Sequence, residues 1–403
     1  MPEEKRGMLC GVKVLDFTLA LSGPFVAWNL ADWGADVYKV ERLYYGDQAR
    51  QWDPIMNGLS TLFVAYNKNK KSIEIDLSKD EGKQIIYDLA KECDIVLENF
   101  KSGSIDRLGL GYAKLKEINP KLVFLSLSGF GATGPLKPYP CYDAIAAARS
   151  GFAGSSGKPD GAPVKAGNAI CDTLAGTYAL NAVLMAYIDA QITGEGTHID
   201  LSMTDVAMET VSESLIDYAY DKEFQMRTGN HDRYFAPYGI FKAADGWVSI
   251  VVDSEERWEK FCQELELTSL TDDDRFKDNA KRLANKEELI KIIENKTETL
   301  SRFSMEKNLL KAGVPASAML TFIEAYTSDH ANSTNVTELI EQKNIGMMRF
   351  YTNPLRFDDR VCPIKSGSPL LGEHTREALE SLGYSEEKIQ KLFAEDVVGE
   401  SLT

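Results

Sequence analysis

The spacing of hydrophobic and polar residues alternates between the period of a strand and the period of a helix along the first half of the chain. Short apolar runs bounded by glycine, proline or charged residues predict strands. These runs lie at 12–17, 36–41, 94–98, 120–128 and 198–202. Helical patterns separate them, at 23–33, 79–91 and 174–190. Because strands that alternate with helices form βαβ units, we expect an α/β fold with a parallel sheet.

The pattern changes after residue 205. A helical stretch runs to about residue 220, and two strand-like runs then flank the turn Ala244-Asp-Gly246, which predicts a hairpin. The runs are 234–241 and 247–252, and helical patterns follow at 256–267, 272–279 and 285–303. Beyond them, a charged stretch at 327–341 carries clusters of turn-forming residues. We therefore expect a smaller α+β domain followed by a surface linker.

Composition and charge narrow the class of protein. The 403 residues are 44% hydrophobic and 26% charged, which is ordinary for a soluble globular protein with room for two domains. The formal net charge of −16 argues against a nucleic-acid partner, because phosphate backbones are bound by basic surfaces. Any anionic ligand must therefore be bound by local lysines and arginines.

The cysteines and histidines predict neither a disulfide framework nor a metal site. The six cysteines contain no CxxC pair, and the four histidines lack metal-ligand spacing. The first residues lack the apolar core of a signal peptide, and no window approaches the roughly 18 apolar residues of a membrane span. These observations predict a cytoplasmic protein with reduced thiols and no membrane partner.

The glycine-containing loops exclude several common nucleotide sites. The loop Thr18–Pro24 after the first strand lacks GxGxxG, which disfavours a nicotinamide dehydrogenase. The turn Gly129–Pro135 lacks a following Lys-Ser/Thr pair and is not a P-loop. The chain has no GxSxG motif either, so hydrolase interpretations are weak.

One acid, Asp172, stands where a loop of small residues at 166–171 meets the helical run that follows. Its position predicts a helix N-cap or first-turn residue, and a capping role alone is one interpretation. Gly167 and Gly176 on either side leave bare backbone, which lets a ligand approach closely. A helix N-terminus also keeps a carboxylate ionised and hence nucleophilic. The neighbouring thiol of Cys171 is a formal alternative nucleophile, but no histidine lies nearby in sequence to activate it.

The motif around this acid resembles a known family. Asp172-Xaa-Xaa-Ala-Gly176, the following helix and Thr193-Gly-Glu-Gly-Xaa-Xaa-Ile-Asp-Leu-Ser202 resemble the class III CoA-transferases, the CaiB/BaiF family of formyl-CoA, carnitine and bile-acid CoA-transferases. The first strand, its Gly-Pro loop and Lys39-Val-Glu-Arg42 are similar to the opening of these enzymes. The resemblance extends over nearly the whole chain and is strongest up to residue 205. It implies that Asp172 is the catalytic nucleophile.

The resemblance also implies an architecture. The family has a Rossmann-like large domain built from both chain ends, a smaller middle domain, and two ring-shaped chains that interlock into a homodimer. We therefore expect the following boundaries: the first part of a large CoA-binding domain at 1–205, a linker at 206–227, a small domain at 228–320, a linker at 321–344, and a return to the large domain at 345–403.

Several positions match the CoA-binding residues of the family. The resemblance places an arginine on the adenine, a basic loop near the nucleotide phosphates or ribose, and a strand-end Asn-Phe pair with a following arginine along the CoA channel. It also places a glycine turn and the tyrosine after it near the thioester. The matching residues are Arg42, Lys70, Lys71, Asn99, Phe100, Arg107, Gly129 and Tyr142. Without the resemblance, Arg42 and the lysines would be interpreted as solvated charges and Phe100 as a core residue.

The predicted function is transfer of CoA from an acyl-CoA donor to a carboxylic acid acceptor. A carboxylate that attacks a thioester forms a mixed anhydride and then an aspartyl-CoA thioester, while backbone N–H groups of glycine turns stabilise the oxyanion. This chemistry needs no metal and no tightly bound cofactor, since the CoA thioester is a substrate. By resemblance, formyl-CoA/oxalate enzymes carry a long glycine run that is missing here, which disfavours that substrate pair. The predicted acceptor is a 2-hydroxy acid or a related short branched or aromatic acid.

Two alternatives remain open. One is an α-methylacyl-CoA racemase, which needs two acid/base groups on opposite faces of the α-carbon. By resemblance, the racemase branch carries a histidine where this chain has Tyr142, and a phenol with a pKa near about 10 is a poor base at neutral pH. The other is a non-catalytic CoA-binding scaffold.

Overall fold

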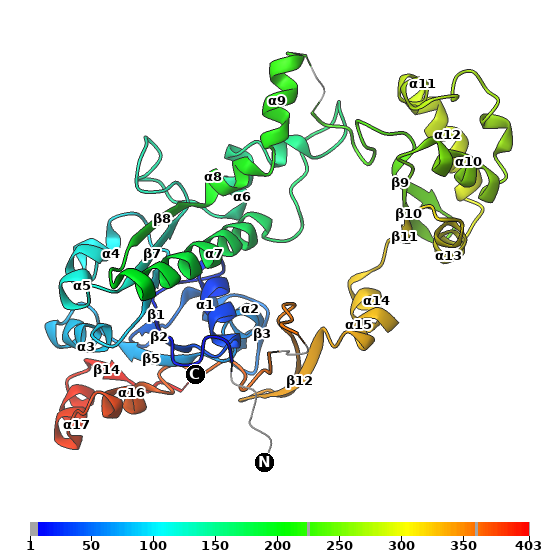
Figure 1. Cartoon of the computed structure of the whole chain (residues 1–403). Coiled ribbons are helices and arrows are strands. Elements are labelled where there is room, and N and C mark those ends of the chain that lie inside the picture. Colours follow the sequence, from blue (N-terminus) through cyan, green and yellow to red (C-terminus); the bar gives the residue numbers. More distant parts are fainter. Residues whose placement is uncertain (1–6, 224–225, 359–361, 403) are drawn as a thin grey trace. The chain divides into compact units, whose positions relative to one another are not determined.

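The structure is a computed structural model that describes residues 7–223, 226–358 and 362–402 (Figure 1). Its contacts divide the chain into two compact units. The first unit consists of Met1–Phe152, Ala166–Ser212 and Asp329–Thr403, and the second of Ala153–Lys165 and Glu213–Ser328. The second unit thus takes a short segment from within the predicted large domain. The boundaries predicted from the sequence stay predictions.

The first unit is built on a mixed sheet with the order β14-β5-β2-β1-β6-β7-β8. The strands are β1 Lys13–Asp16, β2 Asp36–Arg42, β5 Lys71–Ile75, β6 Ile95–Glu98, β7 Val123–Ser128, β8 His198–Ser202 and β14 Val398–Gly399. From β5 to β8 every pair is parallel, and only β14 at the edge runs antiparallel. Without β14, the strands follow the order 3-2-1-4-5-6 of doubly wound α/β sheets. The expected α/β fold with a large parallel sheet is confirmed.

Helices cover both faces of this sheet. On one face, α3, α5, α16 and α17 pack on a core that includes Leu15, Val40, Ile73 and Phe124. On the other face, α1 and α7 pack against each other and α7 contacts β7. The helices of this unit are α1 Ser22–Asp32, α2 Thr61–Tyr66, α3 Asp80–Ala90, α4 Ser104–Arg107, α5 Tyr112–Ile118, α6 Asp143–Arg149, α7 Ile170–Thr193, α8 Met203–Glu209, α15 Asp329–Ser333, α16 Thr375–Ser381 and α17 Glu386–Ala394, with a 3-10 turn at Gln48–Gln51.

The second unit has its own sheet and core. Its sheet has the order β11-β10-β9, and helices pack on it around a core with Phe241, Trp258 and Phe261. The elements are β9 Tyr238–Ala243, β10 Gly246–Val251, β11 Ala316–Ala318, α9 Ser212–Tyr220, α10 Glu255–Glu264, α11 Asn279–Ala284, α12 Lys286–Thr297, α13 Arg302–Ala312 and α14 Phe322–Thr327, with 3-10 turns at Ala153–Ser155 and Thr268–Leu270. The predicted hairpin is confirmed, since Ala243 and Gly246 are paired across its turn.

One predicted helix is wrong, and the stretch expected to be a linker contains secondary structure of its own. The helix expected at 272–279 is absent from this described part of the chain, because the Asp273 carboxylate accepts a hydrogen bond from the N–H of Arg275 in a turn and Asp278 caps a helix that begins only at Asn279. The linker expected at 327–341 contains α15 and the start of a hairpin of β12 Thr337–Gln342 and β13 Gly346–Tyr351. A second small hairpin, β3 Ile55–Met56 with β4 Leu59–Ser60, was also not predicted.

Across the described ranges, none of the helices combines the length and apolarity needed to span a bilayer.

Candidate active site

Asp172 lies in the first turn of α7, as the sequence predicts. The start of α7 is held by an acid from another helix. Asp143, the first residue of α6, accepts hydrogen bonds through Oδ1 from the backbone N–H groups of Cys171 at 2.8 Å and Asp172 at 3.3 Å. The unpaired amides of a helix N-terminus are therefore satisfied by the side chain of Asp143, and Asp172 is left free of the capping role that the sequence allowed.

The hydroxyl of Ser22 donates a hydrogen bond to the Asp172 carboxylate. Ser22 begins α1, and the contact depends on close packing of α1 against α7. A Cβ at Gly176, one turn after Asp172, would lie 2.7 Å from Cδ1 of Phe25 and 2.9 Å from the carbonyl oxygen of Ser22. Gly176 thus serves helix packing and not the ligand approach that we expected, whereas a Cβ at Gly167 would meet nothing within 4 Å.

The electrostatic surroundings of Asp172 differ from the expectation. Burial, reinforced by the negative charge of Asp143, raises the pKa of Asp172 to about 6, and the hydrogen bond from Ser22 opposes this rise. The sequence predicts that the helix N-terminus favours the charged form of Asp172, but burial outweighs this effect. The carboxylate is still mostly ionised at neutral pH, and an anion with a raised pKa is a stronger nucleophile than an ordinary aspartate. The Cys171 thiol is buried.

A cavity of about 490 Å³ opens at the carboxyl edge of β1, β2, β5 and β6. Ligands bind at this edge in open α/β sheets. Arg42, the last residue of β2, lines the cavity with its guanidinium 4.9 Å from the centre of the Tyr45 ring. Phe100 and Leu19 line it from the loops after β6 and β1. An arginine, two aromatic rings and apolar walls suit a planar, charged ligand such as a nucleotide.

The loop that carries Leu19 also carries Ser22, so it joins the cavity to Asp172. Asn99 holds this loop: its Oδ1 accepts from the N–H of Leu19 at 2.7 Å, and its Nδ2 donates to the carbonyl of Leu19 at 2.8 Å. Ser22 is three residues after Leu19, so the Cα atoms of these two residues are at most about 11 Å apart. The structure therefore brings Arg42 and Phe100 to one cavity, and Asn99 holds the loop that leads from this cavity to Ser22.

Lys70 is placed elsewhere. Its ammonium is fully buried and donates to Asp16 at 3.0 Å, to the carbonyl of Pro24 at 3.1 Å and to Asn67 at 2.9 Å. These contacts use all three donors of an ammonium group. Burial lowers the pKa of Lys70 to about 8, although the charge of Asp16 opposes that effect.

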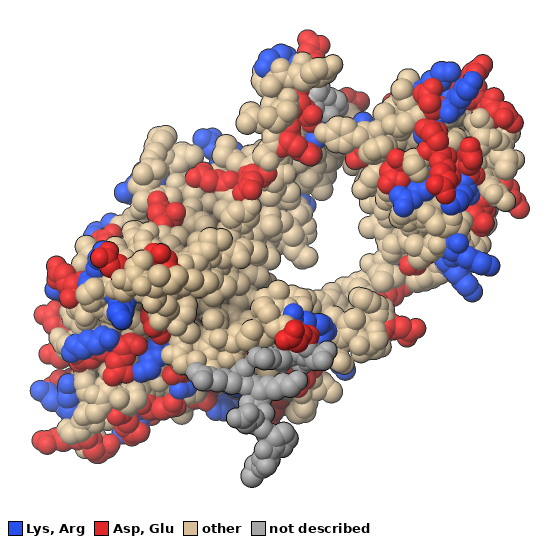
Figure 2. Space-filling view, viewed as in Figure 1, with Lys and Arg blue, Asp and Glu red and all other residues tan. Residues whose placement is uncertain are grey.

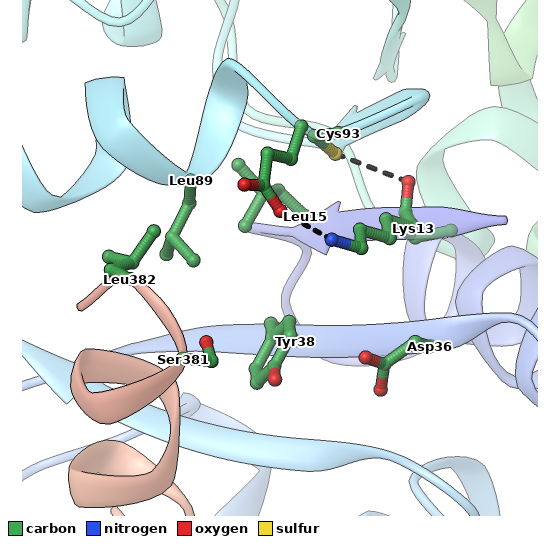
Figure 3. A pocket seen from close by; sticks show the side chains of 10 residues that line it. Lys13, Leu15, Asp36, Tyr38, Leu89, Cys93, Ser381 and Leu382 are labelled. Atoms are coloured by element: carbon green, nitrogen blue, oxygen red, sulfur yellow. Dashed lines mark hydrogen bonds and ion pairs between the residues drawn. The ribbon is translucent and has the colours of Figure 1, made fainter. Parts of the chain in front are cut away.

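Lys71 lies at the amino edge of the sheet, at the opposite end of the strands from Arg42. Its ammonium is 3.0 Å from both Asp36 and Glu377. Asp36 also lines a cavity of only about 130 Å³ at this edge, together with Lys13 and Tyr38 (Figure 3). The structure does not bring Lys70 or Lys71 to the cavity of Arg42, so the CoA site proposed below does not include them.

Gly129 and Tyr142 lie near Asp172. A Cβ at Gly129 would be 2.0 Å from Cβ of Cys141. The negative charges of Asp172 and Asp143 help to raise the pKa of the Cys141 thiol, so Cys141 lies near both acids. The carbonyl of Gly129 accepts hydrogen bonds from Thr204, at 3.0 Å from its N–H and 2.7 Å from its hydroxyl. Tyr142 is exposed and directly precedes Asp143 at the start of α6. These contacts require a glycine at position 129 for close packing, in addition to the expected role of its N–H in stabilising the oxyanion.

Arg107 ends α4, where it is exposed and donates from Nη2 to the hydroxyl of Ser104 at 2.9 Å. Its neighbour Leu108 lines the cavity, but Arg107 does not itself appear among the lining residues.

Sequence reasoning missed Ser22 and Asp143 as partners of Asp172. Asp143 is 29 positions away in sequence, and nothing in the spacing shows that α6 and α7 meet at their N-termini. For Asp143, the signal in the sequence was its position next to Tyr142, a residue that the resemblance places near the thioester. For Ser22, the signal was its place before Gly23-Pro24 in a loop at the carboxyl end of a strand.

Comparisons with known proteins agree over the length of the chain. The sequence model of CoA-transferase family III matches residues 9–375. Human succinyl-CoA:glutarate CoA-transferase is 32% identical over 395 residues, which cover 98% of this chain and 90% of that protein. Succinate–glutarate CoA-transferase of Agrobacterium fabrum is 33% identical, with 95% of this chain and 97% of that protein covered. The crystal structure of a CaiB/BaiF family protein from Brucella suis superimposes with a TM-score of 0.85 at 32% identity, covering 94% of this chain and 100% of that one.

Proposed function

Because the chain belongs to CoA-transferase family III, we propose that it moves CoA from an acyl-CoA to a free carboxylate through covalent intermediates on Asp172. The observation that carries this assignment is the environment of Asp172: a half-buried carboxylate at a helix start, with a hydrogen bond from Ser22 and a pKa near 6. Such a group is ionised in the working enzyme yet poorly solvated, and both properties favour nucleophilic attack.

The proposed transfer of CoA proceeds in four steps. The Asp172 carboxylate attacks the acyl carbon of the donor, and CoA leaves as a thiolate, which gives a mixed anhydride. The thiolate attacks the aspartyl carbonyl, which releases the donor acid and forms an aspartyl-CoA thioester. The acceptor carboxylate then attacks the aspartyl carbonyl of this thioester, which expels CoA thiolate and forms a second mixed anhydride between Asp172 and the acceptor. Attack of the thiolate on the acceptor's acyl carbon gives the new acyl-CoA and restores Asp172.

Each step develops negative charge on a carbonyl oxygen. Backbone N–H groups that are already oriented stabilise such charge without reorganising. The turn that begins at Gly129 supplies candidate donors, because it lies against Cys141 beside Asp172. Gly131 in the same turn has a φ of 73°, in the left-handed region that favours glycine.

The CoA nucleotide is proposed to occupy the cavity of about 490 Å³. Arg42 would stack on the adenine, as it already stacks on Tyr45, and Phe100 would pack against the apolar part of CoA. Asn99 fixes the loop between this cavity and Asp172. Arg107 is left as an outer contact for the phosphates, since its exposed side chain is held by one neutral partner.

For the substrates, we propose succinyl-CoA as donor and a short dicarboxylate as acceptor. Support comes from the relatives named for succinyl-CoA and glutarate at about one third identity. The 2-hydroxy acids predicted from the sequence are the second acceptor class to test. Succinyl-CoA would be incubated with a panel of dicarboxylates, 2-hydroxy acids and monocarboxylates, and the CoA esters would be separated by chromatography. Absence of a new CoA ester with every acid would contradict the transferase function.

We also propose that two chains assemble into a homodimer through α7. This 24-residue helix is apolar around most of its circumference, yet Met185 and Ile192 expose 69% and 78% of their surface. Figure 2 shows a largely uncharged surface over this helix. Exposed apolar surface of this kind marks an interface. Light scattering should show a dimer for the wild type and for Lys116→Glu on α5, and a monomer for Ile188→Glu.

A racemase function is the second candidate. Tyr142 next to Asp143 is the feature that distinguishes the two, since the racemase branch has a histidine there by resemblance. The deuterium experiment described in the Discussion separates the two reactions.

A further inference from the structure

The loop between β1 and α1 is held mainly by buried side chains. Asp16 accepts a hydrogen bond from the N–H of Thr18 at 2.9 Å, and the Lys39 ammonium donates to the carbonyl of Thr18 at 2.7 Å. The next residue, Leu19, binds Asn99 through both its N–H and its carbonyl. The path of this loop therefore depends on side chains from β1 itself, from β2 and from the end of β6.

The following residue adopts an unusual backbone conformation. Ala20 has a φ of 65°, in the left-handed region that residues other than glycine rarely enter. Its N–H donates to the carboxylate of Asp47 at 3.1 Å, and Asp47 is ion-paired with Lys39 at 3.0 Å. Conformations of this kind persist only where surrounding contacts impose them, and they gather at functional sites.

Lys70 joins the two ends of the loop. Its buried ammonium binds Asp16 before the loop and the carbonyl of Pro24 after it. Lys39 and Lys70 are both fully buried, as are Asp16 and Asp47. Buried ion pairs are costly to desolvate and contribute little net stability, so their use here calls for a role beyond holding the fold together.

The loop between β1 and α1 carries two residues of the proposed site. Leu19 lines the cavity proposed for CoA, and Ser22 donates its hydrogen bond to Asp172. A Cβ at Gly23 would lie only 2.4 Å from Cβ of Thr18, so the loop is tightly folded on itself. A small change in its path would move Ser22 and Leu19 together.

We propose that Lys39 and Lys70 are positioning residues of the transfer reaction: through Thr18, Ala20 and Pro24 they fix the loop that sets Ser22 against Asp172 and Leu19 against the CoA nucleotide. The proposal rests on the proposed function of Asp172. It gives Lys70, expected from the sequence to bind CoA, an indirect role in the same site.

The chain provides a matched control two positions away. Lys68 is also buried and ion-paired, but its ammonium binds Asp32 at the end of α1 and not a group of the loop at 18–22. Substitution of either lysine by glutamine removes one buried ion pair, so both variants should lose stability. Only Lys70→Gln should disturb Ser22.

The experiment compares Lys70→Gln, Lys39→Gln and Lys68→Gln in the full chain, with CoA transfer measured as a function of pH. We expect kcat/KM to fall on the order of 10²-fold in the first two variants, the loss typical of a misplacement of about 1 Å. Loss of the Ser22 hydrogen bond leaves Asp172 facing Asp143 and Cys141, so the acid midpoint of kcat should move upward, as in Ser22→Ala. Combining Lys70→Gln with Ser22→Ala should add little further shift. Lys68→Gln should keep the wild-type midpoint and KM.

Equal midpoints and equal KM in Lys70→Gln and Lys68→Gln would overturn the proposal. If Lys70→Gln does not fold, Asp16→Asn/Lys70→Gln carries the same test, because it leaves no unpaired charge behind. Failure of both to fold, while Lys68→Gln folds, would assign Lys70 a purely structural role and also overturn the proposal. A wild-type protein without any transfer activity would instead contradict the proposed function itself.

Discussion

The carboxylate of Asp143 accepts a hydrogen bond from the backbone N–H of Asp172, at 3.3 Å between Oδ1 and N. Through this contact, two acids from the N-termini of α6 and α7 are brought together. Asp143 stabilises the start of α7 and at the same time adds a negative charge beside the proposed nucleophile. Together with burial, this charge gives Asp172 a pKa of about 6. The first two predictions follow from that environment.

The ionised side chain of Asp172 should lower the free energy of unfolding of the protein at neutral pH. Because the folded state binds a proton on Asp172 more tightly than the unfolded chain, ionisation of Asp172 costs folding free energy as pH rises from about 4 to above 6. Asp172→Asn should therefore raise the free energy of unfolding by up to about 3 kcal/mol at about pH 8 and change it little at about pH 4. Urea unfolding at the two pH values measures the difference. A gain of equal size at both would contradict the raised pKa.

The acid limb of the pH–rate profile should report Asp172. Transfer requires the ionised carboxylate, so kcat should fall as pH drops through about 6. Ser22→Ala removes a hydrogen bond that favours the charged form and should move the midpoint upward. Asp143→Asn removes a negative charge while asparagine can still cap α7, so it should move the midpoint downward.

Opposite shifts in these two variants are the decisive feature, because general damage to the site would not produce them. Asp205→Asn, which changes an acid in the first turn of α8, serves as a control that should leave the midpoint in place. Shifts in the same direction for Ser22→Ala and Asp143→Asn would show that another group controls the limb.

The sequence predicts those parts of this site that are local. Asp172 falls at a helix start because small residues precede an apolar helical run, and the alternation of strands and helices predicts the parallel sheet. The charged residues were harder, because a lysine in a loop gives no sign of whether the fold buries it. Lys70 and Lys71 are adjacent in sequence, yet one is enclosed by Asp16 and Asn67 and the other lies at the amino edge of the sheet.

Long-range partnerships also escaped prediction for a physical reason. Ser22 reaches Asp172 because Gly176 allows α1 to approach α7 closely, and Asp143 reaches it because the start of α6 lies against the start of α7. In the hairpin of β12 and β13, apolar and charged residues do not alternate cleanly, so its pattern is that of a linker. Its pairing is instead supported by packing of Phe350 with Leu59, Val64 and Ile364.

The CoA cavity predicts a kinetic difference between two cationic residues. Arg42→Ala should raise KM for the acyl-CoA several-fold and leave kcat nearly unchanged, which is the signature of lost uniform binding. Lys71→Ala is the matched control, since its ammonium lies at the amino edge between Asp36 and Glu377. Initial rates over a range of acyl-CoA concentrations test both variants. A larger KM effect for Lys71→Ala than for Arg42→Ala would move the CoA site to the other edge of the sheet.

A transferase should not exchange the α-proton of its substrate. Incubation of the protein with a 2-methylacyl-CoA in deuterated water, without an acceptor acid, should leave the α-position unlabelled by mass spectrometry. The reason is that Asp172 acts as a nucleophile, and the racemase reaction needs a second acid/base group opposite it. Rapid deuteration would support the racemase alternative, and Tyr142→Phe would then show whether the phenol takes part.

The most direct measurement is the covalent intermediate on Asp172. The protein is incubated with succinyl-CoA in the absence of an acceptor, digested under mildly acidic conditions and analysed by mass spectrometry, with Asp172→Asn treated in parallel. We predict a CoA adduct on the peptide that contains Asp172, its loss on addition of an acceptor acid with formation of the corresponding CoA ester, and no adduct in Asp172→Asn. An adduct on another residue, or wild-type turnover by Asp172→Asn, would contradict the assignment of Asp172 as the nucleophile.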